Sequence, residues 1–200
     1  MADASNQTPA LLVTREDELR AVAARLAQAP RIAVDIESNG LFKYRATLCT
    51  MQLATPDEVV VVDTLVTPLA PLAGLLGPSG PRKIVHDVAF DARILAEANL
   101  VLANVLDTSL AARMLGRTAT GLASLLASEL GITMDKKLQH HDWTERPLAS
   151  EQLRYLAEDV VHLEALAEKL WSAVEERGIA EAVEVETRYR LAQAIAAAGT

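Results

Sequence analysis

The chain has little cysteine, few aromatic side chains and no long apolar run. Its 200 residues contain one cysteine, Cys49, and aromatic residues make up only 4%. A single thiol cannot form an internal disulfide, which excludes a disulfide-built secreted fold and favours a reducing compartment. No apolar run reaches the roughly 18 residues of a membrane span, and the polar N-terminus does not look like a secretory signal. We therefore expect a cytoplasmic protein that does not contact the membrane.

The charge balance is acidic, with a formal net charge of −8 at pH 7. Broad binding to duplex DNA depends on many Lys and Arg contacts to phosphate, so this composition disfavours it. It does not exclude a small site in which bound cations supply the positive charge. Apolar residues make up 50% of the chain, which is enough for one domain with a sizeable core.

Hydrophobic periodicity predicts an α/β domain with a mixed sheet flanked by helices. We expect strands at 11–13, 31–36, 47–54, 58–63, 83–85 and 105–106. The short links between the second, third and fourth strands predict an antiparallel meander, and the later alternation of strands with helices predicts parallel strands. We expect helices at 15–28, 69–76, 87–98, 108–116, 150–177 and 180–197, and one that opens at Gly121 and ends before Gly131. The predicted division is a disordered N-terminus at 1–10, a domain at 11–177 and a C-terminal helix at 178–200.

Two helix starts have candidate caps. Thr14, with Asp17 three residues on, predicts the start of the helix at 15–28, and Asp107 predicts the start of the helix at 108–116.

Two acids share the second predicted strand. Asp35 and Glu37 are two residues apart, so both side chains point to the same face of the sheet. Carboxylates brought together lose hydration and repel one another, and a divalent cation commonly offsets that cost. The alternative is a strand end whose acids reach solvent.

Further acids lie on two predicted helices. Tyr155 and Asp159 are four residues apart and so lie on one helical face, either at a functional site or as a surface hydrogen-bonding pair. Asp91 and Asp87 are one turn apart, and spacing alone does not choose between them. His140 and His141 invite a zinc interpretation, but no Cys or regular His spacing supports it.

Three segments together resemble the motifs of the DEDD exonuclease superfamily, in the subclass with a tyrosine, and most closely ribonuclease D-like 3′-5′ exonucleases. The segments are Val34-Asp-Ile-Glu37, His86-x-x-x-Phe90-Asp91 and Tyr155-x-x-x-Asp159. The second match selects Asp91 over Asp87. Two accessory stretches are also similar, Leu106-Asp-Thr108 and Lys136-x-x-Gln139-x-x-Asp142-Trp143-x-x-Arg146-Pro147-Leu148. The resemblance covers residues 12–175.

This resemblance implies a ribonuclease H-like fold and hydrolysis of RNA from its 3′ end to nucleoside 5′-monophosphates. It implies two Mg²⁺ or Mn²⁺ ions roughly 4 Å apart, held by carboxylate oxygens. Asp35 would bridge the ions, Glu37 and Asp159 would complete the ion that binds water, and Asp91 would support the second. Tyr155 would orient the attacking water.

Substrate contacts are expected mainly from residues near these motifs. Aromatic and basic character in the loop at 39–45 suits stacking with a strand end, although an ordinary surface loop remains the alternative. Phe90 either contacts the substrate or belongs to the core. The residues before the third motif either order a loop over the site or touch phosphate. Trp143 in that stretch is expected to be a structural anchor. The candidate nucleic-acid contacts are Ile36, Phe42, Tyr44, Arg45, Gln52, His86, Phe90, Lys136, Gln139 and Arg146.

The sequence departs from the family pattern in a few places. Ile36 stands where Thr is frequent, His141 where Ser often occurs, and Ala149 where a hydroxyl N-cap is common, a role that Ser150 is then expected to take. The helical C-terminal module common in ribonuclease D is not in this sequence, which leaves the substrate open. A short-oligoribonucleotide RNase and a single-stranded DNA exonuclease therefore remain alternatives. A non-catalytic scaffold is a remote one, because the five proposed catalytic residues are intact.

Overall fold

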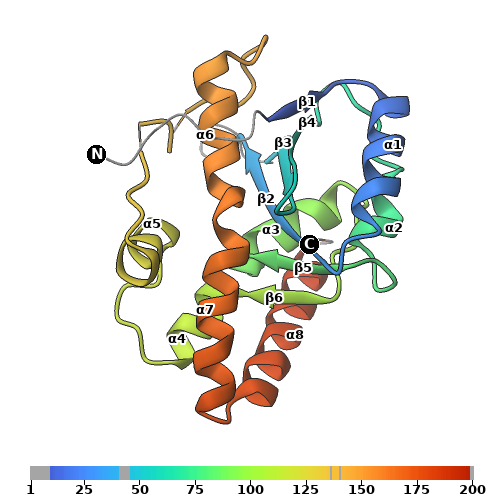
Figure 1. Cartoon of the computed structure of the whole chain (residues 1–200). Coiled ribbons are helices and arrows are strands. Elements are labelled where there is room, and N and C mark those ends of the chain that lie inside the picture. The colour runs from blue at the N-terminus through green and yellow to red at the C-terminus, as the bar shows by residue number, and fades with distance from the viewer. Residues whose placement is uncertain (1–9, 41–45, 136, 140, 199–200) are drawn as a thin grey trace.

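The computed structural model describes residues 10–40, 46–135, 137–139 and 141–198. Within them, six strands form one sheet in the order β1-β4-β3-β2-β5-β6 (Figure 1). The strands are β1 (Leu11–Val13), β2 (Arg31–Ser38), β3 (Leu48–Ala54), β4 (Val59–Asp63), β5 (Arg82–Val85) and β6 (Val105–Asp107). The pairs β2–β3 and β3–β4 are antiparallel, whereas β5 pairs in parallel with β2 and β6. The predicted mixed sheet is confirmed, and β1 joins its edge in parallel with β4.

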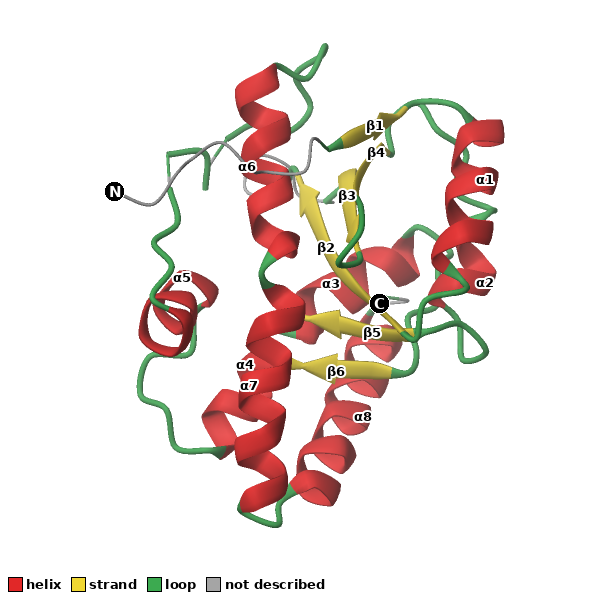
Figure 2. Cartoon of the chain, viewed as in Figure 1, coloured by secondary structure: helices red, strands yellow, loops and turns green. Residues whose placement is uncertain are grey.

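Helices cover both faces of the sheet (Figure 2). One face packs against α1 (Glu16–Leu26), α2 (Leu72–Leu76), α3 (Val88–Glu97) and α8 (Ala180–Ala197). The other carries α6 (Ser150–Val161) and α7 (Leu163–Glu176), which form a long rod in Figure 1. Beside α7 lie α4 (Thr108–Met114), α5 (Leu122–Leu125) and the π-helix η1 (Leu126–Leu130). None of the described helices is both long and apolar enough to cross a bilayer.

The alternation of side chains along β2 decides which way its acids point. Val34 and Ile36 belong to the core with α1, α2 and α3, whereas Ala33 packs with Val160 and Leu163 of the opposite face. Because the side-chain period of a strand is two, Asp35 and Glu37 follow Ala33. Both acids are therefore directed to the face covered by α6.

Two expected helix boundaries are corrected. The N-cap of α1 is Arg15, not Thr14, and it makes no side-chain cap hydrogen bond. Asp17 instead accepts two hydrogen bonds from the Arg15 guanidinium, at 2.9 and 2.7 Å, so the predicted capping box does not form. The helix expected to run unbroken over 150–177 is interrupted at His162. The two parts pack against different surroundings: α6 lies on β3 and β4, whereas α7 contacts α4 and η1.

The start of α6 also differs from the expectation. Its N-cap is Ala149, and Ser150 is already helical. Ala149 has no side-chain acceptor, so only one half of a capping box exists. The Gln152 side chain accepts a hydrogen bond from the Ala149 backbone N–H at 2.6 Å.

Asp107 performs its predicted capping role and a second one. Its carboxylate accepts from the backbone N–H of Leu110 at 3.0 Å, which caps α4. It also accepts from the N–H groups of Asp87 and Val88, at 3.2 and 2.9 Å, where α3 begins. One buried carboxylate therefore fixes the start of the helix that carries Asp91.

Candidate active site

Three predicted acids meet between β2 and α6. Asp35, Glu37 and Asp159 each offer a carboxylate oxygen, and these oxygens lie within 4.8 Å of one another. Two come from the strand face described above and the third from the helix that covers it. The structure thus gathers residues that are more than a hundred positions apart in the sequence.

The neighbouring strand supplies polar side chains on the same face. Gln52 pairs with Asp35 and Thr50 with Glu37 in the β2–β3 register, and directly opposed residues of an antiparallel pair share a face. Gln52 is completely buried, and its Nε2 donates to Thr50 Oγ1 at 2.7 Å. Its Oε1 has no hydrogen-bond partner among the described residues. Gln52 therefore lies opposite the acids in the sheet but presents no surface to a nucleic acid, so its prediction as a substrate contact is wrong.

Asp91, rather than Asp87, faces the acid cluster. Asp91 lies in the first turn of α3 and is 7% exposed, and its Oδ2 has no partner in the described part of the chain. Burial raises the pKa of Asp91 well above its ordinary value, and repulsion from Asp35 and Glu37 raises it further. Asp87 is exposed, at a left-handed φ of 67°. The sequence spacing left Asp87 and Asp91 equally possible, and the burial of Asp91 favours the same residue as the family resemblance.

A bound cation would relieve the repulsion among these partly desolvated acids. Burial is the largest cause that raises the pKa of Asp35 to about 7, of Glu37 to about 8 and of Asp159 to about 9. Repulsion from Asp35 adds to the rise at Glu37 and Asp159. An all-oxygen donor set of this kind suits Mg²⁺ or Mn²⁺, and the unpartnered Asp91 Oδ2 offers one more ligand. The residues present therefore fit a divalent metal site.

Tyr155 stands one helical turn before Asp159 on α6. Burial, followed by the charges of Asp159, Glu37 and Asp35, raises the pKa of the Tyr155 phenol far above its ordinary value. The hydroxyl therefore stays protonated at neutral pH and is able to donate a hydrogen bond beside the acids.

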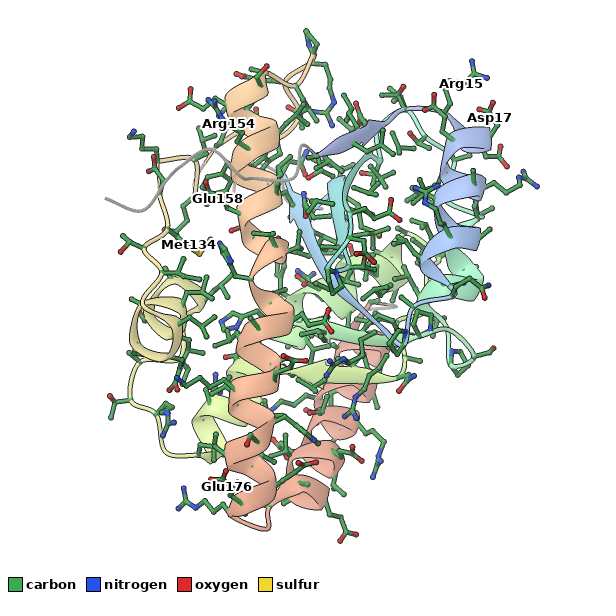
Figure 3. The ribbon with its side chains drawn as sticks, in the orientation of Figure 1. Arg15, Asp17, Met134, Arg154, Glu158 and Glu176 are labelled. Atoms are coloured by element: carbon green, nitrogen blue, oxygen red, sulfur yellow. The ribbon has the colours of Figure 1, made fainter. Side chains whose placement is uncertain are left out.

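A pocket of about 170 Å³ opens beside these two residues. Its walls combine α6 with the start of α5 and the loop after η1, and Figure 3 shows Met134 of that loop next to α6. The lining residues are Gly121, Leu122, Ala123, Ser124, Met134, Asp135, Gln139, Tyr155 and Asp159. Gln139 thus lines this pocket, whereas the wall from α5 was not anticipated from the sequence.

Phe90 is a surface residue and not part of the core. Its side chain is 46% exposed, with the Arg93 guanidinium 5.6 Å from the ring centroid. A Cβ at Gly40 would lie 3.9 Å from Phe90 Cζ, so the ring stands beside the end of β2. An exposed aromatic ring therefore lies just beyond the end of the strand that carries Asp35 and Glu37.

His86 is anchored by a short chain of hydrogen bonds. Its Nδ1 lies 2.9 Å from Thr108 Oγ1, which itself donates to the Val85 carbonyl at 3.0 Å. Burial lowers the pKa of His86. The ring is half-buried, so part of it remains accessible at the end of β5.

Two further predicted contacts are corrected by burial and bonding. The Ile36 side chain is 5% exposed and packs in the core on the face of β2 opposite the acids, so only its backbone is near them. Arg146 directs all five of its N–H donors to protein oxygens, which leaves none for phosphate. The acceptors are both Asp63 oxygens and the carbonyls of Cys49, Trp143 and Glu145, at 2.6–2.9 Å. Arg146 therefore orders the loop before α6, which was the alternative interpretation.

Several candidate residues cannot be placed. Phe42, Tyr44, Arg45 and Lys136 lie outside the described residues, as does His140. His141 is described, and its Nε2 contacts Gln152 Nε2.

A sequence model of the family described as "3'-5' exonuclease" matches residues 11–175. The chain belongs to this family. Ribonuclease D of Gluconacetobacter diazotrophicus is 38% identical over 174 residues, which are 85% of this chain and 44% of that protein. The exosome complex component 10 homolog of Drosophila melanogaster is 30% identical over 156 residues, which are 76% of this chain and 17% of that protein. This exonuclease domain thus sits in the ribonuclease D/RRP6 branch and spans less than half the length of these relatives.

Solved structures agree with this placement. Escherichia coli RNase D, described as an exoribonuclease involved in structured RNA processing, superimposes with a TM-score of 0.87 at 27% identity, over 93% of this chain and 50% of that chain. The catalytic core of Trypanosoma brucei RRP6 gives 0.86 at 26% identity, over 92% and 52%. Brucella melitensis NrnC with bound Mg²⁺ gives 0.80 at 23% identity, which shows a shared fold. The ribonuclease H-like fold expected from the sequence is confirmed.

The raised acid pKa values predict how stability depends on pH. Glu37 has an ordinary pKa of 4.5 and a folded-state pKa of about 8, so between these values the folded exonuclease domain binds more protons than the unfolded chain. Its stability in EDTA should therefore fall as the pH rises from about 5 to 9. Glu37→Gln should make this decline shallower, and Mg²⁺ should raise the Tm of the wild type at pH 8 more than that of the variant. Scanning calorimetry in EDTA and in Mg²⁺ checks this, and stability that rises with pH in EDTA would contradict it.

Proposed function

We propose that the protein is a 3′-5′ exoribonuclease of the tyrosine-containing DEDD subclass, active on single-stranded RNA ends. The observation that carries the proposal is the convergence of Asp35, Glu37 and Asp159 within 4.8 Å, with Asp91 and Tyr155 coupled to them by charge. Family membership and the named ribonuclease D relatives support the same reaction.

The acids are the proposed ligands of two Mg²⁺ or Mn²⁺ ions. Asp35 would bridge them, Glu37 and Asp159 would complete one site, and Asp91 would support the other. When bound, such ions generate a nucleophile from water at neutral pH and stabilise the leaving oxygen of a phosphodiester. The Mg²⁺ named for NrnC, a protein of the same fold, supports this choice of metal.

Tyr155 is the proposed orienting residue. Its protonated hydroxyl lies on the same face of α6 as Asp159 and borders the pocket. A hydrogen bond donor there would fix the direction from which water attacks the phosphorus. The products would be a nucleoside 5′-monophosphate and an RNA shortened by one nucleotide, with a new 3′-hydroxyl.

The 3′ end of the RNA is proposed to enter between the pocket and Phe90. Exposed aromatic rings stack with bases of any sequence, and the exposed Phe90 ring lies just beyond the end of β2, which carries two of the acids. His86 and Gln139 are further proposed contacts, because one lies at the end of β5 and the other lines the pocket. The proposed location of the protein is the cytoplasm.

The catalytic assignment predicts a matched pair of variants one helical turn apart. Asp91→Asn should lose activity by roughly 10³-fold, because a ligand charge disappears, while the exposed Asp87→Asn should stay near the wild-type rate. Asp35→Ala should abolish activity, and Tyr155→Phe should lose roughly 10²-fold. The assay follows shortening of a 5′-labelled single-stranded RNA in Mg²⁺, with EDTA as the metal-free control.

The same assay tests the substrate. Running a dinucleotide, a longer RNA and single-stranded DNA in parallel separates the proposed activity from a short-oligoribonucleotide RNase and a DNA exonuclease. An Asp35→Ala variant that keeps wild-type activity would refute the assigned site, and a wild type without hydrolysis of any substrate would leave the scaffold interpretation.

The stacking role of Phe90 predicts a binding defect. Phe90→Ala should raise the Kd for labelled single-stranded RNA in EDTA by about 5- to 150-fold, which is the range expected for the loss of one stacked base. Tyr189→Ala is the matched control, because Tyr189 is an exposed aromatic residue, 57% exposed, on α8. Fluorescence anisotropy measures both, and equal affinities for the two variants would contradict the proposal.

A further inference from the structure

Trp143 connects two proposed catalytic residues that come from different elements. It lies in the loop before α6, is 1% exposed and packs in a cluster with Cys49, Val61 and Leu156. Its ring and the Tyr155 ring have centroids 5.8 Å apart, tilted by 33°. The catalytic tyrosine therefore rests on the indole along one side.

The indole N–H has no established partner of its own. Trp143 Nε1 is buried and makes no hydrogen bond to any of the described residues. An interaction between Trp143 and the Glu37 carboxylate nevertheless lowers the pKa of Glu37, against the rise caused by burial and by Asp35. A buried N–H with no other partner is costly, so its closeness to a carboxylate needs an explanation.

The loop holds the indole in this place through its backbone. The Arg146 guanidinium donates to the Trp143 carbonyl at 2.8 Å and grips Asp63 of β4 at 2.6 and 2.8 Å. The His141 ring meets the indole edge to face, with centroids 5.1 Å apart. The indole is thus fixed to the sheet from which Glu37 projects, while it touches the helix that carries Tyr155.

We propose that Trp143 is a positioning residue whose N–H orients the Glu37 carboxylate for metal binding and whose ring orients the Tyr155 hydroxyl. This role rests on the proposed nuclease function. It predicts that the two actions are separable, because one depends on a polar hydrogen and the other on an aromatic surface.

Two substitutions separate them. Trp143→Phe keeps an aromatic surface and removes the N–H, so Mg²⁺ affinity should fall by about 10-fold or more, as is usual for the partner of a metal ligand. Its kcat should recover at saturating Mg²⁺, with an unchanged KM for RNA. Trp143→Leu removes both features, so its kcat should stay low at saturating Mg²⁺. Trp171→Phe is the control, because Trp171 lies on α7 under the Arg82 guanidinium.

The measurements are metal titration by calorimetry, single-turnover hydrolysis and thermal unfolding for each variant. Wild-type Mg²⁺ affinity in Trp143→Phe would overturn the role of the N–H, and full recovery of Trp143→Leu by Mg²⁺ would overturn the role of the ring. A wild type that neither hydrolyses RNA nor binds Mg²⁺ would instead overturn the proposed function.

A measurement without any change at Trp143 guards against loss of folding in its variants. The chain has two tryptophans, so its two indole N–H resonances are assigned with Trp171→Phe. In otherwise unchanged protein, Glu37→Gln should move the Trp143 resonance and leave that of Trp171 in place. A Trp143 resonance that does not respond to Glu37→Gln would overturn the proposal, whatever the activity.

Discussion

The mutual repulsion of carboxylates that are partly or fully buried is the constraint around which this structure is arranged. Asp35, Glu37, Asp91 and Asp159 are brought together where burial alone already disfavours their charged forms. Hydrophobic packing would gain more from apolar side chains at these positions. A fold that nevertheless keeps four acids close enough to repel one another gives up stability for a set of oxygen ligands that fits divalent cations.

The rest of the fold holds these acids against their repulsion. Alternation along β2 buries Val34 and Ile36 on one face, which directs the strand acids to the other. Asp107 fixes the start of α3 through backbone N–H groups, so Asp91 cannot move away without breaking that cap. Arg146 ties the loop before α6 to β4, and the ring of Trp143 in that loop packs against Tyr155. These contacts come from different segments of the chain, so the geometry of the site depends on the fold of the whole domain.

Much of this was predictable from the sequence because periodicity reports on burial. The period of two in β2 predicted the shared face of Asp35 and Glu37, and the spacing of four predicted that of Tyr155 and Asp159. Asp107 was predictable as a cap because a side-chain acceptor before a helix has one common use. The choice of Asp91 over Asp87 was not accessible from spacing, since both lie on one helical face, and it came from the family resemblance.

The misjudged residues depended on tertiary contacts that a linear pattern does not contain. The break at His162 reflects different packing of the two halves of an otherwise continuous amphipathic pattern. Arg146 was considered for phosphate, but three of its donors are taken by Asp63 and by the Cys49 carbonyl, which are distant in sequence. Gln52 was a candidate substrate contact, and the register places it opposite Asp35, but its side chain is completely buried. The sequence predicted a helix that opens at Gly121, but nothing in it indicated that this helix forms a wall of the pocket.

The most direct test of the central claim is anomalous diffraction from crystals soaked in Mn²⁺. Two anomalous peaks roughly 4 Å apart are expected, with Asp35 between them and Glu37, Asp91 and Asp159 around them. Crystals that diffract well and bind Mn²⁺ elsewhere, but show no peak at these carboxylates, would contradict it.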